Sequence, residues 1–443
     1  MVASPTKYDY AQGLFWPQPP DNPKLVRALF CGREQDLDHC VSRLKASCDV
    51  NGKQARNGSK VPWVIHGESR SGKSHLARMV MQKLPKRKKR FQIFVPAKER
   101  LEASAVMESI FEALSADFLK ATEDVTLKED LQPYSIVQLT RNLISEVRQF
   151  SGGAESVIVK VDAGQKAGLE AGVKLSPIPK IFEFTLTHRS EASDGNTLEV
   201  HLAPPSAKDL AEYSGMIVDC LHHVGLLSHV LILVDDADLL ETYVNENRNG
   251  RVERSRLTDC LCYLHQQPCV DVLLTARSWY TYSRNEFENL NGVGLDPLSP
   301  ETLVAIHDRH YEVFRRKNAP ARFLDSAALE SASGLADGKP GIFLRHLQTA
   351  FSDYQRESSW GERSYDWFLG VFRQIYLSHK SRYPDAVTAL EKAVSRGALS
   401  IDVSRGNPFV GTVFDDEFVF QSYYEETSYM ASPLIQQVIQ NQD

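Results

Sequence analysis

Continuous apolar runs and helically spaced apolar residues take turns along the first two thirds of the chain. Short runs begin at Val61, Val230 and Val270, and runs of this length bounded by polar residues are typical of buried strands. A helix is predicted after the first run by apolar residues that share one face, namely Leu76, Met79, Val80 and Leu84. Buried strands that alternate with helices indicate an α/β fold with a parallel sheet.

Other segments depart from this alternation. Four stretches between 151 and 205 (ESVIVKVDAG, LEAGVKLS, KIFEFTLT and TLEVHL) alternate apolar and polar residues between Gly, Pro and Asn, which predicts hairpin strands. We interpret them as a β-rich insertion that serves recognition or assembly, or else as a structural flap. Residues 206–227 then predict a helix that leads back into the sheet. The last ninety residues predict helices followed by a hairpin at 417–439, which suggests a winged-helix-like domain.

Length and composition indicate a multidomain soluble protein. A chain of 443 residues is too long for one compact core. The hydrophobic content of 42% and the charged content of 24% are ordinary, and no apolar run approaches the length of about 18 residues that a membrane span needs. The first residues lack an apolar signal core. Seven cysteines without framework spacing fit a reducing compartment, so we expect a cytoplasmic protein with no membrane association.

The charge is unevenly distributed. Residues 1–150 hold 24 Lys and Arg against 17 Asp and Glu, whereas residues 351–443 hold 8 against 13. Any polyanion should therefore meet the first third of the chain. Five consecutive basic residues, Lys86–Arg90, either contact double-stranded DNA or form a solvated loop. The predicted C-terminal wing carries Asp415, Asp416, Glu417, Glu425 and Glu426, which would repel a phosphate backbone and favour contact with protein.

The most specific motif follows the first apolar run. Residues 67–74 read GESRSGKS and match the pattern G-x-x-x-x-G-K-[ST]. The glycines let successive backbone N–H groups turn inward around a polyphosphate, and the amino end of the next helix adds partial positive charge. Lys73 can reach the β- and γ-phosphates, while the Ser74 hydroxyl can bind Mg²⁺. Because the motif lies between a predicted strand and a predicted helix, nucleotide binding is favoured over a chance match on a Gly/Ser-rich turn.

The second apolar run ends in acid, since residues 230–240 read VLILVDDADLL. We expect Asp235, at the strand end, to hold Mg²⁺ through water or through Ser74. Asp236 would lie near the attacking water as a base or an orienting group, and Asp238 would orient either neighbour. By itself the pattern fits equally well a strand that runs into an Asp-rich turn, and the phosphate-binding motif upstream favours the catalytic interpretation.

Taken in order, these motifs and four weaker ones resemble the AAA+ and STAND branch of P-loop ATPases, particularly its initiator-like and signalling members. The resemblance covers most of residues 28–350. LFCGREQDLDHCVSRL (29–44) resembles the entry box that borders the adenine, and VDVLLTARSWY (270–280) resembles the sensor-1 strand. LDPLSPETLVAIHDRHYEVF (295–314) resembles the exit into a helical lid. GLADGKPGIFLRHLQTAF (334–351) resembles the sensor-2 region, with Lys339, Pro340 and Arg345 of interest.

The resemblance implies ATP and Mg²⁺ as cofactors and assigns roles by position. The implied catalytic residues are Lys73, Asp236 and Arg277, with Thr275 as a second candidate to read the γ-phosphate. The implied metal ligands are Ser74 and Asp235. The implied nucleotide-binding residues are Arg33, Gly67, Ser69, Ser71, Gly72, Lys73, Ser74, His75 and Arg345.

One departure from the family pattern concerns Asp236. Many AAA+ motors carry glutamate at this position, and aspartate is one methylene shorter, so it holds a water less well. The signalling branch often has this Asp-Asp pair. The resemblance therefore implies slow or stimulated hydrolysis, which suits a switch better than a continuous motor.

Three smaller features remain open. Cys260, Cys262, His265 and Cys269 match no common zinc spacing, which favours buried thiols. One of Arg248, Arg251, Arg254 and Arg256 could reach the γ-phosphate of a neighbouring copy, or the four could decorate a solvated loop. The Pro- and aromatic-rich arm at 1–27 could dock on a neighbouring subunit or pack on its own core.

We expect four regions, which are the arm at 1–27, a P-loop ATPase core at 28–294 with the β-rich insertion at about 151–205, a helical lid at 295–350 and a winged-helix-like C-terminal domain at 351–443. Three functions remain possible. The first is an ATP-gated switch that forms a homo-oligomeric ring or filament and activates a protein effector, as in bacterial defence or other conflict systems. The second is a DNA-associated initiator- or transposition-type ATPase. The third is a scaffold in which the nucleotide is only structural.

Overall fold

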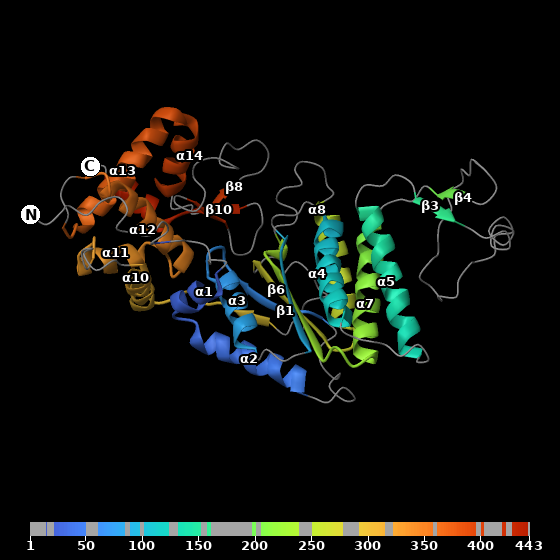
Figure 1. Cartoon of the computed structure of the whole chain (residues 1–443). Helices are drawn as coiled ribbons and strands as arrows, with labels where there is room; N and C mark the ends of the chain where they lie inside the picture. Colours follow the sequence, from blue (N-terminus) through green and yellow to red (C-terminus); the bar gives the residue numbers. More distant parts are fainter. Residues whose placement is uncertain are drawn as a thin grey trace, which may run out of the picture.

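Five parallel strands form the central sheet of the computed structural model, in the order β2-β5-β6-β1-β7 (Figure 1). The strands are β1 (Trp63–Gly67), β2 (Arg90–Pro96), β5 (His229–Asp235), β6 (Val270–Arg277) and β7 (Gly292–Gly294). The structure describes residues 15, 22–49, 61–84, 89–97, 102–123, 132–151, 157–160, 197–200, 205–238, 250–277, 292–314, 322–357, 361–395, 400–402, 419–421 and 428–441. The three strands predicted from continuous apolar runs are confirmed. The first begins at Trp63 rather than Val61, because Pro62 has no N–H to donate to a strand ladder.

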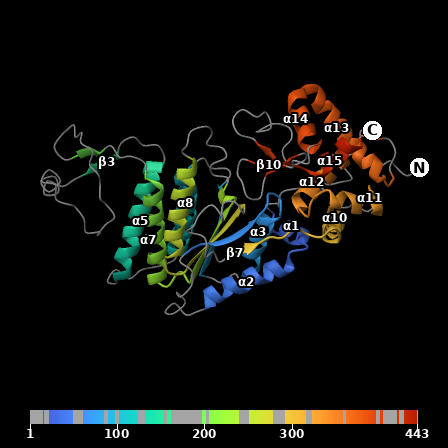
Figure 2. The ribbon, with the colours of Figure 1, turned by 180° about the vertical axis from the view of Figure 1, so that it is seen from behind.

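Helices cover both faces of the sheet (Figures 1 and 2). One face is covered by α1 (Pro23–Leu29), α2 (Glu34–Asp49) and α3 (Lys73–Lys83). The other is covered by α4 (Ala103–Glu123), α7 (Ala207–His223) and α8 (Gly250–His265), with α5 (Gln132–Ser151) packed against α4 and α7. Strand β5 is buried along its whole length. Its side chains alternate between the two faces, which explains why its apolar run is continuous.

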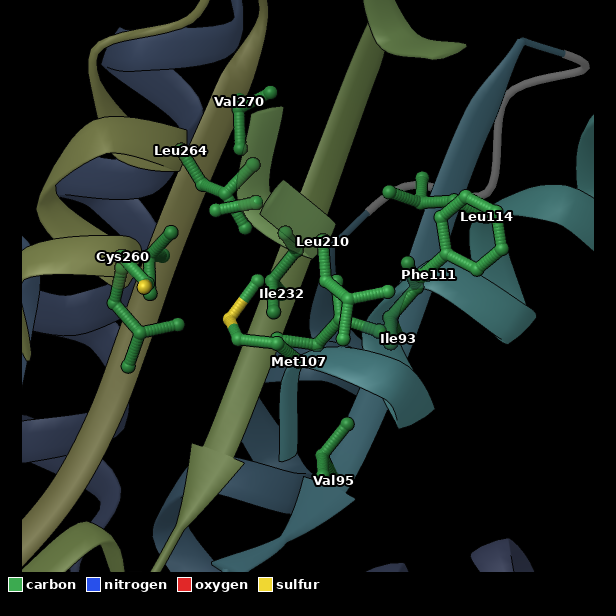
Figure 3. Packing of buried hydrophobic residues seen from close by; sticks show 14 of the residues in the cluster. Ile93, Val95, Met107, Phe111, Leu114, Leu210, Ile232, Cys260, Leu264 and Val270 are labelled. Carbon is green, nitrogen blue, oxygen red and sulfur yellow. The ribbon is translucent and has the colours of Figure 1, made fainter. Parts of the chain in front are cut away.

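The core on the α4 side is built from large side chains that interlock between strands and helices (Figure 3). Ile93 and Ile232 come from the sheet, while Met107 and Phe111 project from α4. Ser206 caps the start of α7, since its hydroxyl accepts from the Asp209 N–H while the Asp209 carboxylate accepts from the Ser206 N–H. This capping box fixes where the helix predicted at 206–227 begins.

The predicted β insertion is described only in part. Strands β3 (Val157–Lys160) and β4 (Thr197–Val200) form an antiparallel pair, as the alternating pattern predicted for these two segments. The pair lies beyond α5, away from the central sheet (Figure 1). The two other predicted strands, LEAGVKLS and KIFEFTLT, lie outside the described residues.

The lid and the C-terminal region share one hydrophobic cluster. The lid helices are α10 (Pro300–Phe314), α11 (Ser326–Gly334) and α12 (Pro340–Tyr354). They are followed by α13 (Tyr365–Arg382), α14 (Pro384–Ser395), β8 (Ser400–Asp402), β9 (Val419–Gln421), β10 (Ser428–Ala431) and α15 (Pro433–Gln440). The three short strands form an antiparallel sheet with β10 in the middle, which together with the helices gives the expected winged-helix-like domain. The boundaries between regions stay predictions, because this cluster runs across residue 350.

The C-terminal hairpin is shorter than predicted. Strands β9 and β10 pair antiparallel, but residues 433–439, which the sequence predicts as part of the hairpin, belong to α15 instead. Ser432 caps this helix through a hydrogen bond from the Ile435 N–H, and Pro433 occupies its first turn. Leu434, Ile435 and Val438 are buried at helical spacing. The acidic residues of the predicted wing lie outside the described part of the chain.

Phe15, in the predicted N-terminal arm, packs on its own chain. Its side chain is 1% exposed and belongs to the cluster of the lid and C-terminal region. It stacks on His307 with ring centroids 5.4 Å apart and meets Tyr311 at 5.7 Å. The arm is thus anchored on its own chain at Phe15. Among the described residues, no helix is long and apolar enough to cross a membrane.

Candidate phosphate-binding site

The loop between β1 and α3 has the geometry that a polyphosphate requires. Gly72 adopts a left-handed conformation (φ 95°), which turns the chain into α3 and which a residue with a Cβ would resist. The Lys73 ammonium lies 3.2 Å from the Gly67 carbonyl oxygen and 2.6 Å from the Glu68 carbonyl oxygen. Lys73 is therefore held over the loop, where it would meet a phosphate. Burial lowers the pKa of Lys73, while the nearby aspartates oppose this shift.

The two predicted metal ligands meet beside the loop. The hydroxyl of Ser74, on the first turn of α3, hydrogen-bonds to the carboxyl of Asp235 at the end of β5. The pKa of Asp235 is raised from 3.8 to about 6, mainly by burial and then by the charge of Asp236. Hydrogen bonds from Thr275 and Ser74 act in the opposite direction. A partly buried hydroxyl beside a carboxylate supplies the oxygen ligands that Mg²⁺ prefers.

Thr275 holds the two aspartates at the end of β5. Its side chain is fully buried. Its hydroxyl donates to the Asp235 carboxylate at 2.5 Å and accepts from the Asp236 N–H at 2.8 Å. Thr275 therefore positions both aspartates, and its implied role as a reader of the γ-phosphate stays a prediction.

Asp236 sits on a sharp turn at the end of β5. Its backbone is left-handed (φ 54°), a conformation that aspartate tolerates better than most residues do. The bond to Thr275 fixes this turn, and the side chain stays partly exposed. The second aspartate thus occupies a strained, fixed position beside the phosphate loop rather than a flexible one.

Asp238 and Arg277 form a buried pair on the same edge of the sheet. Arg277 Nε lies 3.1 Å from Asp238 Oδ2, and the aspartate is 1% exposed. Burial raises the pKa of Asp238, and the Arg277 charge counteracts this. The electrostatic influence of Asp235, Asp236, Asp238 and Arg277 on Lys73 shows that all five groups share one site. Arg277, expected as a sensor, is thus oriented by Asp238.

Arg33 ties the entry segment to the loop and to the start of the lid. Its guanidinium donates to the Ser71 carbonyl at 3.2 Å and to the Asp296 carbonyl at 2.6 Å, and it pairs with Asp36 at 3.4 Å. His75 Nε2 lies 2.8 Å from the Val26 carbonyl oxygen. Both predicted nucleotide-binding residues therefore hold the segments around the loop together. Direct contact of either with a nucleotide stays a prediction.

The lid meets the loop through the start of α12. Lys339 Nζ lies 2.5 Å from Glu68 Oε2, and the Gly341 N–H donates to the Arg70 carbonyl at 3.0 Å. The sequence marked Lys339 for interest but gave Glu68 and Arg70 no role, because the two partners are far apart in the chain and no local pattern links them. Arg345 lies one turn further along α12 and is partly buried. Its predicted contact with the nucleotide stays a prediction.

Other predicted residues divide by location. Gly67 and Ser71 face each other, since a Cβ on Gly67 would lie 2.9 Å from the Ser71 hydroxyl. That hydroxyl is buried and has no hydrogen-bond partner in the described part of the chain, which suits a loop that binds an additional polar group. Ser69 is partly exposed on the loop. Of the arginines proposed to reach a neighbouring copy, Arg248 lies outside the described residues and Arg256 is exposed on α8.

The strand order, the loop and the aspartates give the P-loop architecture that the sequence predicted, with a parallel sheet, a helical lid and a C-terminal domain. The phosphate loop follows β1, the aspartates follow β5, and β6 lies between these two strands. Since the carboxyl ends of parallel strands meet at one edge of a sheet, ligands bind there.

Comparisons with known proteins give likenesses among solved structures alone. No protein-family model matches the chain, and no curated protein matches its sequence. The ORC2 protein of Aeropyrum pernix, in its ADPNP–ADP complexes, is 12% identical with a TM-score of 0.47 and coverage of 97% of both chains. The ORC1 protein of the same organism, in complex with DNA, is 15% identical with a TM-score of 0.45 and coverage of 87% of this chain and 74% of that one.

Domain III of the replication initiation protein DnaA of Thermotoga maritima is 11% identical, with a TM-score of 0.33 and coverage of 82% of this chain and 98% of that one. All three TM-scores lie below 0.5. The description of the fold therefore rests on the strand order and on the site geometry given above.

Proposed function

We propose that the protein binds ATP with Mg²⁺ and hydrolyses it slowly, as a switch that changes the contact between its core and its lid. The observation that carries this proposal is the convergence of Lys73, Ser74, Asp235, Asp236 and Arg277 at the carboxyl edge of the parallel sheet. They follow or end three different strands, β1, β5 and β6, and no structural need of the fold alone would gather two carboxylates and two cations there.

Each of these side chains has a task in such a reaction. Lys73, held by two loop carbonyls, would bind the β- and γ-phosphates. Ser74 and Asp235 would hold Mg²⁺, which when bound neutralises charge on the phosphates. Asp236 would orient or deprotonate the attacking water. Arg277, oriented by Asp238, would sense the γ-phosphate. Loss of the γ-phosphate on hydrolysis would then alter the balance between lid positions.

The finer proposal is that this switch controls assembly with copies of itself and activates a protein effector. ATPases that share a site between subunits associate head to tail, and such contacts give rings or filaments. The acidic excess of residues 351–443 supports a protein partner over nucleic acid for the C-terminal domain. Turnover limited by the short Asp236 side chain suits a timed switch.

Binding of double-stranded DNA is the second candidate, and the basic run supports it. Residues 86–88 lie outside the described part of the chain, whereas Lys89 is exposed and Arg90 starts β2. Arg90 pairs with His229 at one end of β5, and Asp235 stands at the other end. At a strand rise of about 3.3 Å per residue, this places Arg90 about 20 Å from the phosphate site. DNA bound near Arg90 would not touch the phosphate site, so it could change the rate of hydrolysis only through the sheet between them.

Steady-state ATP hydrolysis with and without double-stranded DNA tests both candidates. Lys73→Ala should abolish turnover by removing the phosphate ligand, and Asp236→Asn should abolish it while nucleotide still binds. Slow turnover that ignores DNA supports the effector switch, whereas turnover that rises with DNA and falls steeply with salt supports the DNA candidate. Undetectable turnover with tightly copurified nucleotide would refute the proposed hydrolysis and leave a scaffold.

A further inference from the structure

The contact between the phosphate loop and the lid combines an ion pair with a backbone hydrogen bond. Lys339 Nζ lies 2.5 Å from Glu68 Oε2 and 3.0 Å from Asp337 Oδ2. The Gly341 N–H donates to the Arg70 carbonyl at 3.0 Å. A Cβ on Gly341 would lie 2.9 Å from the Arg70 Cβ, so the loop and α12 approach as closely as glycine permits.

The placement of Lys339 calls for an anion. Lys339 is the N-cap residue of α12, and the amino end of a helix carries partial positive charge that repels a cation. The Lys339 side chain is also only 5% exposed, and burying a charge without a partner is costly. Glu68 supplies the anion from the loop. Asp337 supplies a second one from the lid itself and is half exposed.

The two carboxylates differ in what they connect. Asp337 pairs with Lys339 within the lid, so this contact cannot restrain the lid. Glu68 belongs to the phosphate loop, between Gly67 and the left-handed Arg70 (φ 65°). The pair of Glu68 and Lys339 is therefore a bond between core and lid, made at the site where phosphates would bind.

We propose that Glu68 and Lys339 form a latch between the phosphate loop and the lid, and that the polyphosphate of a bound nucleotide competes with Glu68 for the Lys339 ammonium. This inference rests on the proposed function, because it assumes that the loop binds a nucleoside triphosphate. A phosphate carries more negative charge than a carboxylate and suits both the ammonium and the amino end of α12. Nucleotide binding then exchanges one lid contact for another, and Glu68 lowers the affinity for nucleotide.

A double-mutant cycle with a fluorescent ATP analogue and Mg²⁺ tests the competition. Glu68→Gln removes the competing charge and keeps the size of the side chain, so the affinity should rise about tenfold, within the usual range of coupling between sites. Lys339→Met should lower the affinity by a similar factor. In the Lys339→Met background, Glu68→Gln should change the affinity by about twofold or less, since the shared ammonium is gone.

Asp337→Asn is the matched control. It removes the other carboxylate from the same ammonium without touching the bond between core and lid, so the affinity should change by about twofold or less. A tenfold gain from Glu68→Gln that persists in the Lys339→Met background would overturn the latch, because Glu68 would then act by direct repulsion of phosphate. No gain from Glu68→Gln would overturn it as well.

Hydrogen exchange without nucleotide gives a readout that does not depend on binding. Glu68→Gln should speed exchange of the Gly341 amide and the first turn of α12 at least fivefold, while α13 stays unchanged. Unchanged exchange at Gly341 would overturn the latch even where nucleotide binds normally. Failure of the wild type and all variants to bind nucleotide would instead refute the proposed function and, with it, the competition.

Discussion

The buried carboxyl of Asp235 should make the protein less stable than a neutral side chain would. Its pKa rises from 3.8 in the unfolded chain to about 6, mainly through burial and then through the charge of Asp236. Each unit of difference corresponds to about 1.4 kcal/mol, so the ionised carboxylate costs about 3 kcal/mol of folding free energy above pH 6. Function would thus require a charge that the fold disfavours.

The sign of the pH dependence follows from the raised pKa. Between pH 3.8 and about 6 the unfolded chain has lost this proton while the folded protein still holds it. The proton therefore favours the folded state, and its contribution is complete below pH 3.8. It is lost as the pH rises through about 6.

Asp235→Asn should restore the stability that the wild type loses when Asp235 ionises, as measured in the absence of Mg²⁺ and nucleotide. The amide stays neutral and can still accept the hydrogen bond from Thr275 through its oxygen. Relative to the wild type, the variant should gain about 1.6 kcal/mol at pH 5 and about 3 kcal/mol at pH 8. Urea denaturation at both pH values measures the difference, with Asp259→Asn, exposed on α8, as the control that should change stability by less than about 0.5 kcal/mol.

Mg²⁺ and ATP should invert the ranking. A ligand that binds only the folded protein adds about 4.1 kcal/mol at a concentration of 1,000 times its Kd. This exceeds the advantage of about 3 kcal/mol that the variant has at pH 8, and only the wild type keeps Asp235 as a metal ligand. A stability difference that is the same at pH 5 and pH 8, or a variant less stable than the wild type at pH 8, would refute the reasoning about Asp235.

Three further predictions concern the same edge of the sheet. ATP turnover should fall as the pH drops below about 6, because protonated Asp235 cannot bind Mg²⁺, and a pH–rate profile measures this. Thr275→Val should lower the free energy of unfolding by about 1–3 kcal/mol, because it leaves the Asp236 N–H without its partner. Thr275→Ser should keep most of this stability, and urea denaturation measures both variants. Gly341→Ala should push α12 off Arg70 and raise hydrogen exchange in its first turn without unfolding the lid.

The outcomes that would contradict these predictions are specific. Turnover that is constant between pH 5 and 8 would show that Asp235 does not bind the metal as a carboxylate. Equal stability of the valine and serine variants at position 275 would show that the hydroxyl does not support the turn. Gly370→Ala is the control for the glycine, because a Cβ there would meet nothing within 4 Å. Equal exchange in the two alanine variants would contradict the close approach at Gly341.

The sequence predicted the parts of the fold that have local signals. The buried strands carry continuous apolar runs, and the phosphate loop carries its glycines and lysine at fixed spacing, so both were found. The meeting of Ser74 and Asp235 followed because parallel strands end at one edge of a sheet. Strand β7 gave no such signal, since a Gly-Val-Gly segment has little to bury.

Contacts between distant segments were beyond sequence reasoning. Nothing local indicates that Glu68 and Lys339 meet, or that the Thr275 hydroxyl bonds to two aspartates. The C-terminal hairpin was overextended because the apolar residues after Ser432 fit a strand nearly as well as a helix. The N-cap residue Ser432 and Pro433 in the first turn favour the helix.

The shared hydrophobic cluster of the lid and C-terminal domain has a mechanical consequence. Close-packed interiors do not deform gradually, so α10 to α15 should turn together about the short connection at Asp296–Ser299. Lys339 lies near this pivot, because the Leu298 N–H donates to the carbonyl of the neighbouring Gly338 at 2.8 Å. Strand β10, in the middle of the C-terminal sheet, lies nearer to the core than α10 and α11 do (Figures 1 and 2). The lid and the C-terminal sheet then move as one body, so a displacement of α12 at a bound phosphate also displaces the C-terminal sheet.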